Sequence, residues 1–408
     1  MSVRGRLTTA SALVVLVVVS AVLFVGGGSR FGIGLALTAI ETDLASGRSL
    51  VGVSVALFQI VSAVAMFVAG RSADRVDPAR VLFVGILIAA AGSGALSLVS
   101  APWQLVVLYG VVFAVGNGVA SLIPIGVLVT RHFPARPGLA NAIALAGLGL
   151  GQLAIMAAMT PVLESRGWRT VFLWLGAAHL ALLPLILLIW ARQPVPAPVA
   201  PAVPVANATA AGPAPSVTVA AALRTRHLWL LLAIYALCGF EDFFVSTHIV
   251  AFAQDRGAGL LLAGNLLAFM GLAALIGVIA AGAGADRIGA AGATILCFAV
   301  RVGLFAWILI DQSTPSVAMF ALMFGATFLV TAPLTVVFVR EAFGTRNLGA
   351  LTGLITMVHH ICGGFGAWLG AQLFDVSRDY NVVLAMMLAS SVAGLVLSLA
   401  VGRHRTPR

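Results

Sequence analysis

The feature that most constrains the fold of this chain is a series of long apolar runs separated by short polar breaks. A helix needs about 20 residues to cross roughly 30 Å of hydrocarbon, and each run approaches or exceeds that length. Hydrophobic residues make up 61% of the 408 residues and charged residues only 9%, which excludes an ordinary soluble domain. We predict an all-α membrane protein with twelve transmembrane helices, at 11–40, 49–70, 79–100, 103–130, 138–160, 169–190, 227–252, 259–281, 291–311, 315–339, 347–374 and 380–402.

A short loop occurs twice, once after the second run and once after the eighth. It reads Gly-Arg-Ser-Ala-Asp-Arg at 70–75 and Gly-Ala-Gly-Ala-Asp-Arg at 282–287, 212 residues later. Matching loops in matching places indicate an internal repeat, which is typical of secondary transporters. We therefore predict an N-terminal six-helix bundle at 1–190 and a C-terminal one at 227–408. A cytoplasmic linker at 191–226 would join them, because this stretch holds seven of the chain's 17 prolines and is rich in alanine.

The basic residues give the orientation. All 23 are arginines, and in the predicted topology 16 of them lie on the side of the termini against five on the other side. Arginine is retained on the cytoplasmic face, so both termini should be cytoplasmic in a multi-pass protein of the cell membrane. We therefore expect the surplus of positive charge to contact the anionic headgroups of the lipid bilayer, and we expect no nucleic-acid partner.

No pattern in the sequence indicates an enzyme or a cofactor. There is no phosphate-binding loop or nucleophile elbow, and the three cysteines, Cys238, Cys297 and Cys362, lie inside apolar runs without metal-ligand spacing. We expect no catalytic residue, no metal and no cofactor, transport driven by a gradient, and a monomer.

The repeated loop, in a six-plus-six plan with a central linker, resembles the major facilitator superfamily. Further stretches look like the monocarboxylate porters and their bacterial relatives: Trp103 to Gly110, Arg131 to Ala140, Gly167 to Arg169, His248 to Gly257, and Gly349 to Asp375 followed by Asp379 and Tyr380. The resemblance implies two bundles related by a pseudo-two-fold axis, with spans 1 and 7 facing each other across a central cavity. It also implies alternating access by movement of one half against the other.

The charged residues of the repeated loop are candidates for gating. Asp74, Arg75, Asp286 and Arg287 would sit at cytoplasmic helix ends, where ion pairs can form in one state and break in another. A plain positively charged turn would explain one copy, but two equivalent copies favour the gate. The first copy has Asp77 where the family usually has glycine, whereas the second keeps Gly289.

Four charges fall inside the predicted spans: Arg30, Glu241, Asp242 and Arg301. Each costs about 2.5–3.5 kcal/mol at mid-membrane on insertion scales, so each needs a partner or a role. They sum to zero, so mutual neutralisation is one interpretation, with Arg30 opposite Glu241 or Asp242. Arg301 is equally compatible with packing and with substrate binding.

Arg30 is the first candidate for substrate binding, because a guanidinium can form two parallel hydrogen bonds to a carboxylate. The resemblance supports it, since monocarboxylate porters carry a functional lysine in span 1 and Gly28 to Gly34 matches that stretch. The aspartate–arginine pair of the animal members is missing, because Gly271 and Leu275 stand at the best-matching positions.

Histidines form a second group of candidates. His359 and His360 are adjacent in span 11, and His248 follows Glu241 by seven residues, two turns along one helix face. We assign His360 to substrate binding and His248 and His359 to proton transfer, with helix-to-helix hydrogen bonding as the alternative. Asn117 in span 4 completes the substrate-binding set.

These residues predict a secondary active transporter that carries a small organic anion, a monocarboxylate, together with a proton. Arg30 would bind the anion, and Glu241, Asp242 or a histidine of span 11 would carry the proton. Anion exchange or efflux without net proton movement is the first alternative. A non-transporting membrane sensor on the same scaffold is the second, and the four charges in the spans argue against it.

Overall fold

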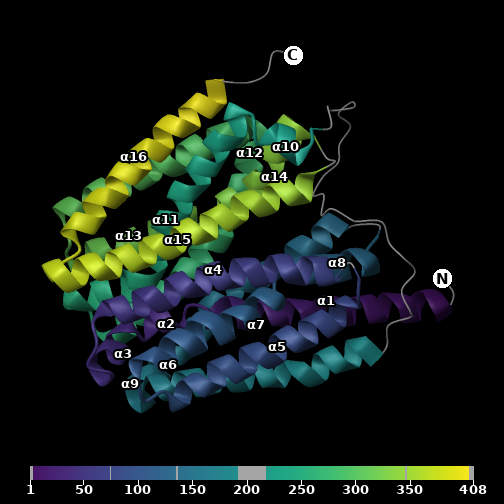
Figure 1. Ribbon diagram of the computed structural model, residues 1–408, viewed down its shortest axis with the longest axis horizontal. Coiled ribbons are helices and arrows are strands. Elements are labelled where there is room, and N and C mark those ends of the chain that lie inside the picture. Colours follow the sequence, from purple (N-terminus) through teal and green to yellow (C-terminus); the bar gives the residue numbers. More distant parts are fainter. Residues whose placement is uncertain (1–2, 74, 135–136, 192–216, 345–346, 404–408) are drawn as a thin grey trace. The chain divides into compact units, whose positions relative to one another are not determined.

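A computed structural model describes residues 3–73, 75–134, 137–191, 217–344 and 347–403. Within these ranges all regular structure is helical (Figure 1). The elements are α1 Val3–Ser29, α2 Gly32–Leu35, α3 Leu37–Asp43, α4 Arg48–Ala73, α5 Pro78–Ala95, η1 Leu96–Leu98, α6 Pro102–Val107, η2 Leu108–Phe113, α7 Ala114–Val119, α8 Leu122–His132, α9 Pro137–Ala191, α10 Val219–Ala222, α11 Arg226–Asp255, α12 Leu260–Ile310, α13 Thr314–Phe328, α14 Thr331–Phe343, α15 Leu348–Ser377 and α16 Asn381–Arg403.

Eleven helical stretches of the described chain are long and apolar enough to cross a membrane. One of them, Leu139–Ala191, is 53 residues long, and a helix of that length would measure about 80 Å, far more than a bilayer. It contains a non-helical residue, Gly167, between the predicted spans 138–160 and 169–190. The all-helical membrane fold is therefore confirmed, and the count of twelve and the cytoplasmic termini stay predictions.

Contacts divide the chain into two compact units. The first comprises Met1–Gly32 and Val61–Ala210, and the second Ile33–Ile60 and Ala211–Arg408. The predicted domain borders at 190 and 227 stay a prediction. Residues 33–60 belong to the predicted N-terminal bundle by sequence, but by their contacts they group with the C-terminal helices.

Glycines let the helices of the first unit approach closely. A Cβ at Gly28 would overlap the Gly151 carbonyl, and one at Gly151 would overlap the Phe24 carbonyl, so α1 and α9 meet backbone to backbone. Gly92 of α5 and Gly116 of α7 allow a similar approach.

In the second unit α11 packs against α15 in the same way. A Cβ at Gly239 would overlap the carbonyl of His359, and one at Gly366 would overlap the carbonyl of Phe240. These contacts bring the acidic residues of α11 next to the histidines of α15.

Two spans are broken at equivalent places, and proline explains both breaks. Span 4 is interrupted at Ala120 and span 10 at Leu329, where the backbone leaves helical geometry. Pro124 and Pro333 each lie four residues later, and a proline ring clashes with the carbonyl of residue i−4. The two prolines are 209 residues apart (333 − 124), close to the 212-residue spacing of the repeated loop, which supports the internal repeat.

The structure also accounts for the difference between the two copies of the loop. Asp77 is the N-cap of α5, and its carboxylate accepts a hydrogen bond of 2.9 Å from the amide of Ala79. Gly289 instead turns the chain with φ of 76°, a conformation that glycine adopts without strain. Each copy thus makes its turn by a different local device.

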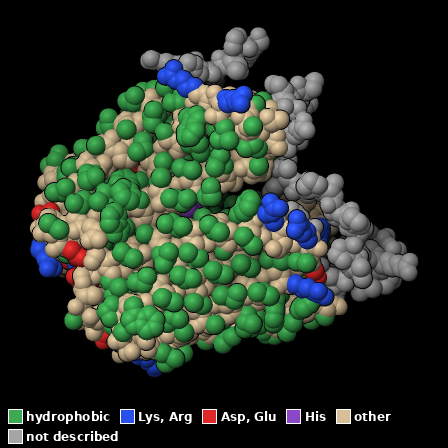
Figure 2. All heavy atoms as spheres, in the orientation of Figure 1, with side chains coloured by type: hydrophobic (Ala, Val, Ile, Leu, Met, Phe, Trp, Pro, Cys, Tyr) green, Lys and Arg blue, Asp and Glu red, His purple; other side chains and the backbone are tan. Residues whose placement is uncertain are grey.

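Apolar side chains cover much of the visible face of the molecule, and charged side chains gather near the helix ends (Figure 2). Large residues such as Ile279, Phe67 and Leu296 are 59–66% exposed. A water-soluble surface does not carry so many, so these faces fit contact with lipid.

Candidate functional site

A buried ion-pair cluster lies in the second unit, on α11 and α12. Arg301 donates to Glu241 Oε2 at 3.1 Å and to Asp242 Oδ1 at 2.6 Å. The side chains of all three residues are at most 1% exposed. Both acids therefore pair with Arg301, whereas a pairing of either with Arg30 stays a prediction.

The broken span supplies further ligands for Arg301. The Thr327 carbonyl accepts from Nη2 at 3.0 Å, and the Thr327 hydroxyl accepts from Nε at 3.0 Å. Thr327 lies in the last turn of α13, where carbonyls lose their helical partners and the helix dipole favours a cation. The break at Leu329, four residues before Pro333, thus leaves Thr327 at a helix end where it helps to hold the arginine.

His359 of α15 lies at the edge of this cluster and is its least buried member. Its Nε2 lies 3.8 Å from Asp242 Oδ2, and its side chain is 16% exposed. Its Nδ1 lies 3.2 Å from the carbonyl of Tyr235, so that nitrogen carries the proton of the neutral ring. Nε2 can then accept a proton next to a carboxylate.

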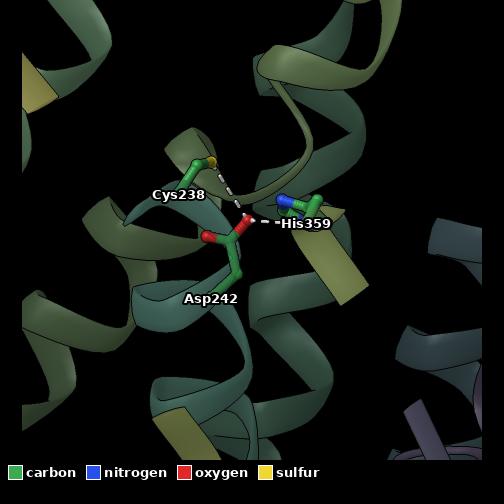
Figure 3. Close-up of side chains that lie close together, drawn as sticks. All are labelled: Cys238, Asp242 and His359. Carbon is green, nitrogen blue, oxygen red and sulfur yellow. Dashed lines mark hydrogen bonds and ion pairs between the residues drawn. The ribbon is translucent and has the colours of Figure 1, made fainter. Parts of the chain in front are cut away.

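Figure 3 shows the Asp242 carboxylate between the thiol of Cys238 and the imidazole of His359. The three donor atoms lie within 4.8 Å of one another, close enough to bind a metal ion. However, Arg301 Nη1 lies 3.6 Å from Cys238 Sγ, and Nη2 binds the same carboxylate. A fixed positive charge at these donors opposes a metal cation, so the group fits proton exchange better.

Only one carboxylate oxygen of Glu241, Oε2, binds Arg301, which leaves Oε1 for other contacts. The hydroxyls of Ser390 and Ser391 on α16 lie next to it. Among the described residues, neither hydroxyl nor Glu241 Oε1 has a hydrogen bond of good geometry. Each serine hydroxyl can donate to Oε1 when the carboxylate is ionised and can accept from it when the carboxyl is protonated, so the site suits either state.

The first unit holds a second group around Arg30. Arg30 is half-buried at the break between α1 and α2, and its guanidinium lies 4.6 Å from the centre of the Phe31 ring. The Tyr109 hydroxyl donates to the Arg30 carbonyl at 2.7 Å, and Asn117 Nδ2 donates to the Gly26 carbonyl at 3.2 Å. Two of the predicted substrate-binding residues, Arg30 and Asn117, therefore lie at the same end of α1.

Tyr109 was missed as a site residue, although it stands in one of the stretches that carry the family resemblance. It belongs to a six-residue π-helix, η2. Such turns are frequent at functional sites because they shift side chains relative to the rest of the helix.

The remaining predicted residues are distributed elsewhere. His360 Nδ1 lies 2.9 Å from the carbonyl of Thr356 one turn earlier, and its substrate contact stays a prediction. His248 Nδ1 lies 3.0 Å from the Tyr380 hydroxyl, which in turn accepts from Arg48. These contacts do not include Glu241. Arg75 and Arg287 are exposed, whereas Asp74 and the side chain of Asp286 lie outside the described residues, so gating by these four also stays a prediction.

Comparison with known proteins decides the family. The profile of the Major Facilitator Superfamily matches residues 19–367, most of the chain. The chain belongs to the Major Facilitator Superfamily. It is a multi-pass membrane protein of a transporter family, as its helices and the resemblance indicated.

Among relatives of this superfamily member, the uncharacterized MFS-type transporter YcxA of Bacillus subtilis is 24% identical over 358 residues, 86% of each chain. The sialic acid transporter NanX of Escherichia coli is 23% identical over an alignment that covers 65% of this chain and 66% of NanX. Monocarboxylate transporter 13 of Rattus norvegicus is 24% identical and covers 78% of this chain and 72% of its own.

Solved transporter structures share the fold. A point mutant of the nucleoside transporter NupG superposes with a TM-score of 0.76 at 13% identity, over 95% of this chain and 99% of that one. A bacterial homolog of the human lysosomal transporter Spinster gives 0.70 at 14% identity, over 96% of each chain.

We predict that the cluster depends on charge balance more than on its arginine as such. Arg301→Met leaves two buried carboxylates without a cation, which should cost about 3–5 kcal/mol of stability. Arg301→Met combined with Glu241→Gln and Asp242→Asn removes all charges and should regain most of that loss. Thermal unfolding of the purified protein in detergent measures both. A triple variant as unstable as the single one would show that packing, not charge, dominates here.

Proposed function

We propose that this protein is a secondary active transporter that takes up a small monocarboxylate together with a proton. The observation that carries the proposal is the buried cluster of one arginine and two carboxylates, which lacks one positive charge for neutrality when His359 is neutral. A net charge in the membrane interior is costly, so binding of one proton by this cluster, which makes its net charge zero, is favourable. The four charges within the spans again speak against a sensor without transport.

Glu241 is the residue proposed to hold that proton. Asp242 makes the shorter bond to Arg301, 2.6 Å against 3.1 Å, and so remains the ionised partner. Glu241 Oε1 is the carboxylate oxygen not bound to Arg301, and it lies beside the hydroxyls of Ser390 and Ser391, which can accept from a protonated carboxyl. His359, the more exposed member, passes the proton in by way of Asp242.

Arg30 is the residue proposed to bind the anion, with Asn117 and the Tyr109 hydroxyl beside it at the end of α1. Two relatives point to the same substrate class, because monocarboxylates and sialic acid both carry a carboxylate. A carboxylate and a proton together carry no net charge, so loading both adds no charge to the membrane interior. This balance favours symport over anion exchange.

Uptake should follow an imposed proton gradient. In proteoliposomes containing the purified protein, an inward gradient of one pH unit can sustain about tenfold accumulation of a singly charged anion in one-to-one symport. We expect Glu241→Gln, which imitates the protonated acid, to abolish this accumulation and to keep counter-flow exchange of labelled substrate.

Glu164→Gln, a change of the same kind at an exposed acid, is the control and should accumulate substrate normally. Gradient-driven accumulation that survives in Glu241→Gln would remove Glu241 from proton coupling. Accumulation by counter-flow alone in the unchanged protein would favour the exchanger.

Affinity for the anion should depend on Arg30. Hydrogen bonds to a charged group contribute about 1.5–3 kcal/mol, so Arg30→Ala should weaken binding of a short monocarboxylate by about 10- to 100-fold. The Tyr109 bond goes to the backbone of Arg30 and should survive the change. Arg30→Lys, which keeps the charge but not the fork, should fall between, and Arg80→Ala at an exposed site of the same unit should bind normally. Calorimetric titration with a panel of short carboxylates measures these affinities; normal binding by Arg30→Ala would place the anion elsewhere.

A further inference from the structure

An exposed patch of basic and apolar side chains lies at the start of α11, within the second unit. It consists of Leu223, Arg224, Arg226 and Trp229, and we call it the basic patch. Leu223 and Trp229 are 39% and 59% exposed, and both arginines are exposed as well. Because α11 is long and apolar enough to cross a membrane, the patch lies at one end of a candidate span. Apolar and cationic side chains thus meet at the level where a bilayer changes from hydrocarbon to headgroups.

Hydrogen bonds fix the backbone that carries the basic patch. Thr218 is the N-cap of α10, and its hydroxyl accepts from the amide of Ala221 at 3.2 Å. Thr225 is the N-cap of α11, and its hydroxyl accepts from the amide of Leu228 at 3.3 Å and donates to the carbonyl of Ala222 at 2.7 Å. The turn from α10 into α11 therefore has a defined shape, which presents the arginines on both sides of Thr225.

The same segment is anchored on the end of α14. The Val217 amide donates to the Phe343 carbonyl at 3.3 Å, and the Val217 carbonyl accepts from Asn347 Nδ2 at 2.8 Å. The His227 ring meets the Phe343 ring edge to face, with the ring centres 5.9 Å apart. Ala222 is fully buried beneath the segment. These contacts hold the segment on the second unit and leave the side chains of the basic patch free to meet a ligand.

The orientation of Trp229 is fixed as well. Its indole Nε1 donates to the Leu223 carbonyl at 2.8 Å, so the two apolar members of the patch lie together across the turn. A tryptophan with a bonded N–H and an exposed ring is typical of the membrane interface, where the indole lies at headgroup level. Trp229 and Leu223 therefore offer an apolar surface directly beside the arginines.

No acidic group of the described chain neutralises these arginines. Neither Arg224 nor Arg226 makes a side-chain hydrogen bond or ion pair with another described residue. The sequence has no acidic residue between Glu164 and Glu241, and Glu241 is bound to Arg301. Arg226 is also the first residue of α11, at the end of the helix where the backbone dipole disfavours a cation. An anion from outside the chain would offset this local charge.

We propose that the basic patch binds the headgroup of an anionic phospholipid. Arg224 and Arg226 bind the phosphate, because a guanidinium forms paired hydrogen bonds to phosphate oxygens. Leu223 and Trp229 contact the glycerol and the first carbons of the acyl chains. A zwitterionic headgroup brings no net charge and leaves the arginines uncompensated. A free phosphate ion supplies the charge but leaves the apolar pair uncovered, so an anionic lipid is the ligand that fits all four side chains.

Quenching of Trp229 fluorescence by brominated lipids tests the proposal and needs neither substrate nor proton gradient. The full chain is reconstituted into phosphatidylcholine vesicles that contain a small fraction of brominated phosphatidylglycerol or of brominated phosphatidylcholine. The chain has seven tryptophans, so Trp229→Phe supplies the signal of the other six (7 − 1), and subtraction leaves that of Trp229. We expect Trp229 to be quenched at a lower fraction of the brominated phosphatidylglycerol.

The arginines should account for this preference. A basic residue close to an anionic lipid surface raises affinity about fivefold, so Arg224→Gln and Arg226→Gln should each lower the binding of phosphatidylglycerol relative to phosphatidylcholine by about fivefold. The two changes combined should lower it by about 25-fold. Both side chains are exposed, so the variants should fold. Arg166→Gln, at an exposed arginine of the first unit, is the matched control and should keep the full preference.

Added inorganic phosphate, compared with chloride at the same ionic strength, distinguishes the free ion from the lipid, and the preference for phosphatidylglycerol should survive it. Equal quenching by the two lipids in the unchanged protein would overturn the proposal. An unchanged preference in the double variant, or an equal loss in Arg166→Gln, would do the same. Loss of the preference with inorganic phosphate but not with chloride would show that the patch takes the free ion instead of the lipid.

Discussion

One guanidinium shared between two buried carboxylates organises the C-terminal helices. Arg301 comes from α12, its carboxylate partners from α11, and its carbonyl ligand from the last turn of α13, while α16 places two serines beside Glu241. Taking these charges out of water costs several kcal/mol per ion, and only this set of partners offsets it. The glycine contact between α11 and α15 then brings His359 within 3.8 Å of Asp242. The packing of four helices and the proposed place of the proton thus follow from the same interaction.

The helix α11 binds two arginines, Arg301 through Glu241 and Asp242, and Arg48 through Asp255. Asp242 and Asp255 are 13 residues apart on it (255 − 242), which is about 20 Å along a helix. One end of α11 therefore binds Arg48 through Asp255, and its middle binds Arg301 and lies next to the half-buried His359.

The sequence carried the fold further than the site. Apolar runs and the repeated loop were enough for the helices and for the superfamily, because membrane spans need only length and hydrophobicity. The four charges in the spans could also be recognised from the sequence, because charged residues stand out within apolar runs. Their pairing was not, because Arg301 and Glu241 are 60 residues apart and only tertiary packing brings them together. The pairing of Arg48 with Asp255 has no local signal for the same reason, because the two residues are 207 positions apart. Pro124 and Pro333 did carry a local signal, and their i−4 positions coincide with the two helix breaks.

The central claim is that the Arg301 cluster holds one proton and that Glu241 carries it. Infrared difference spectroscopy of the purified protein in lipid, recorded while the pH is raised, detects the carbonyl stretch of a protonated carboxyl group directly. Exchange into heavy water shifts that band and identifies it. We expect a band that disappears as the proton leaves, is absent in Glu241→Gln and is unchanged in Glu164→Gln. A cluster without a protonated carboxyl at any pH at which the protein is folded, or a band that persists in Glu241→Gln, would contradict this claim.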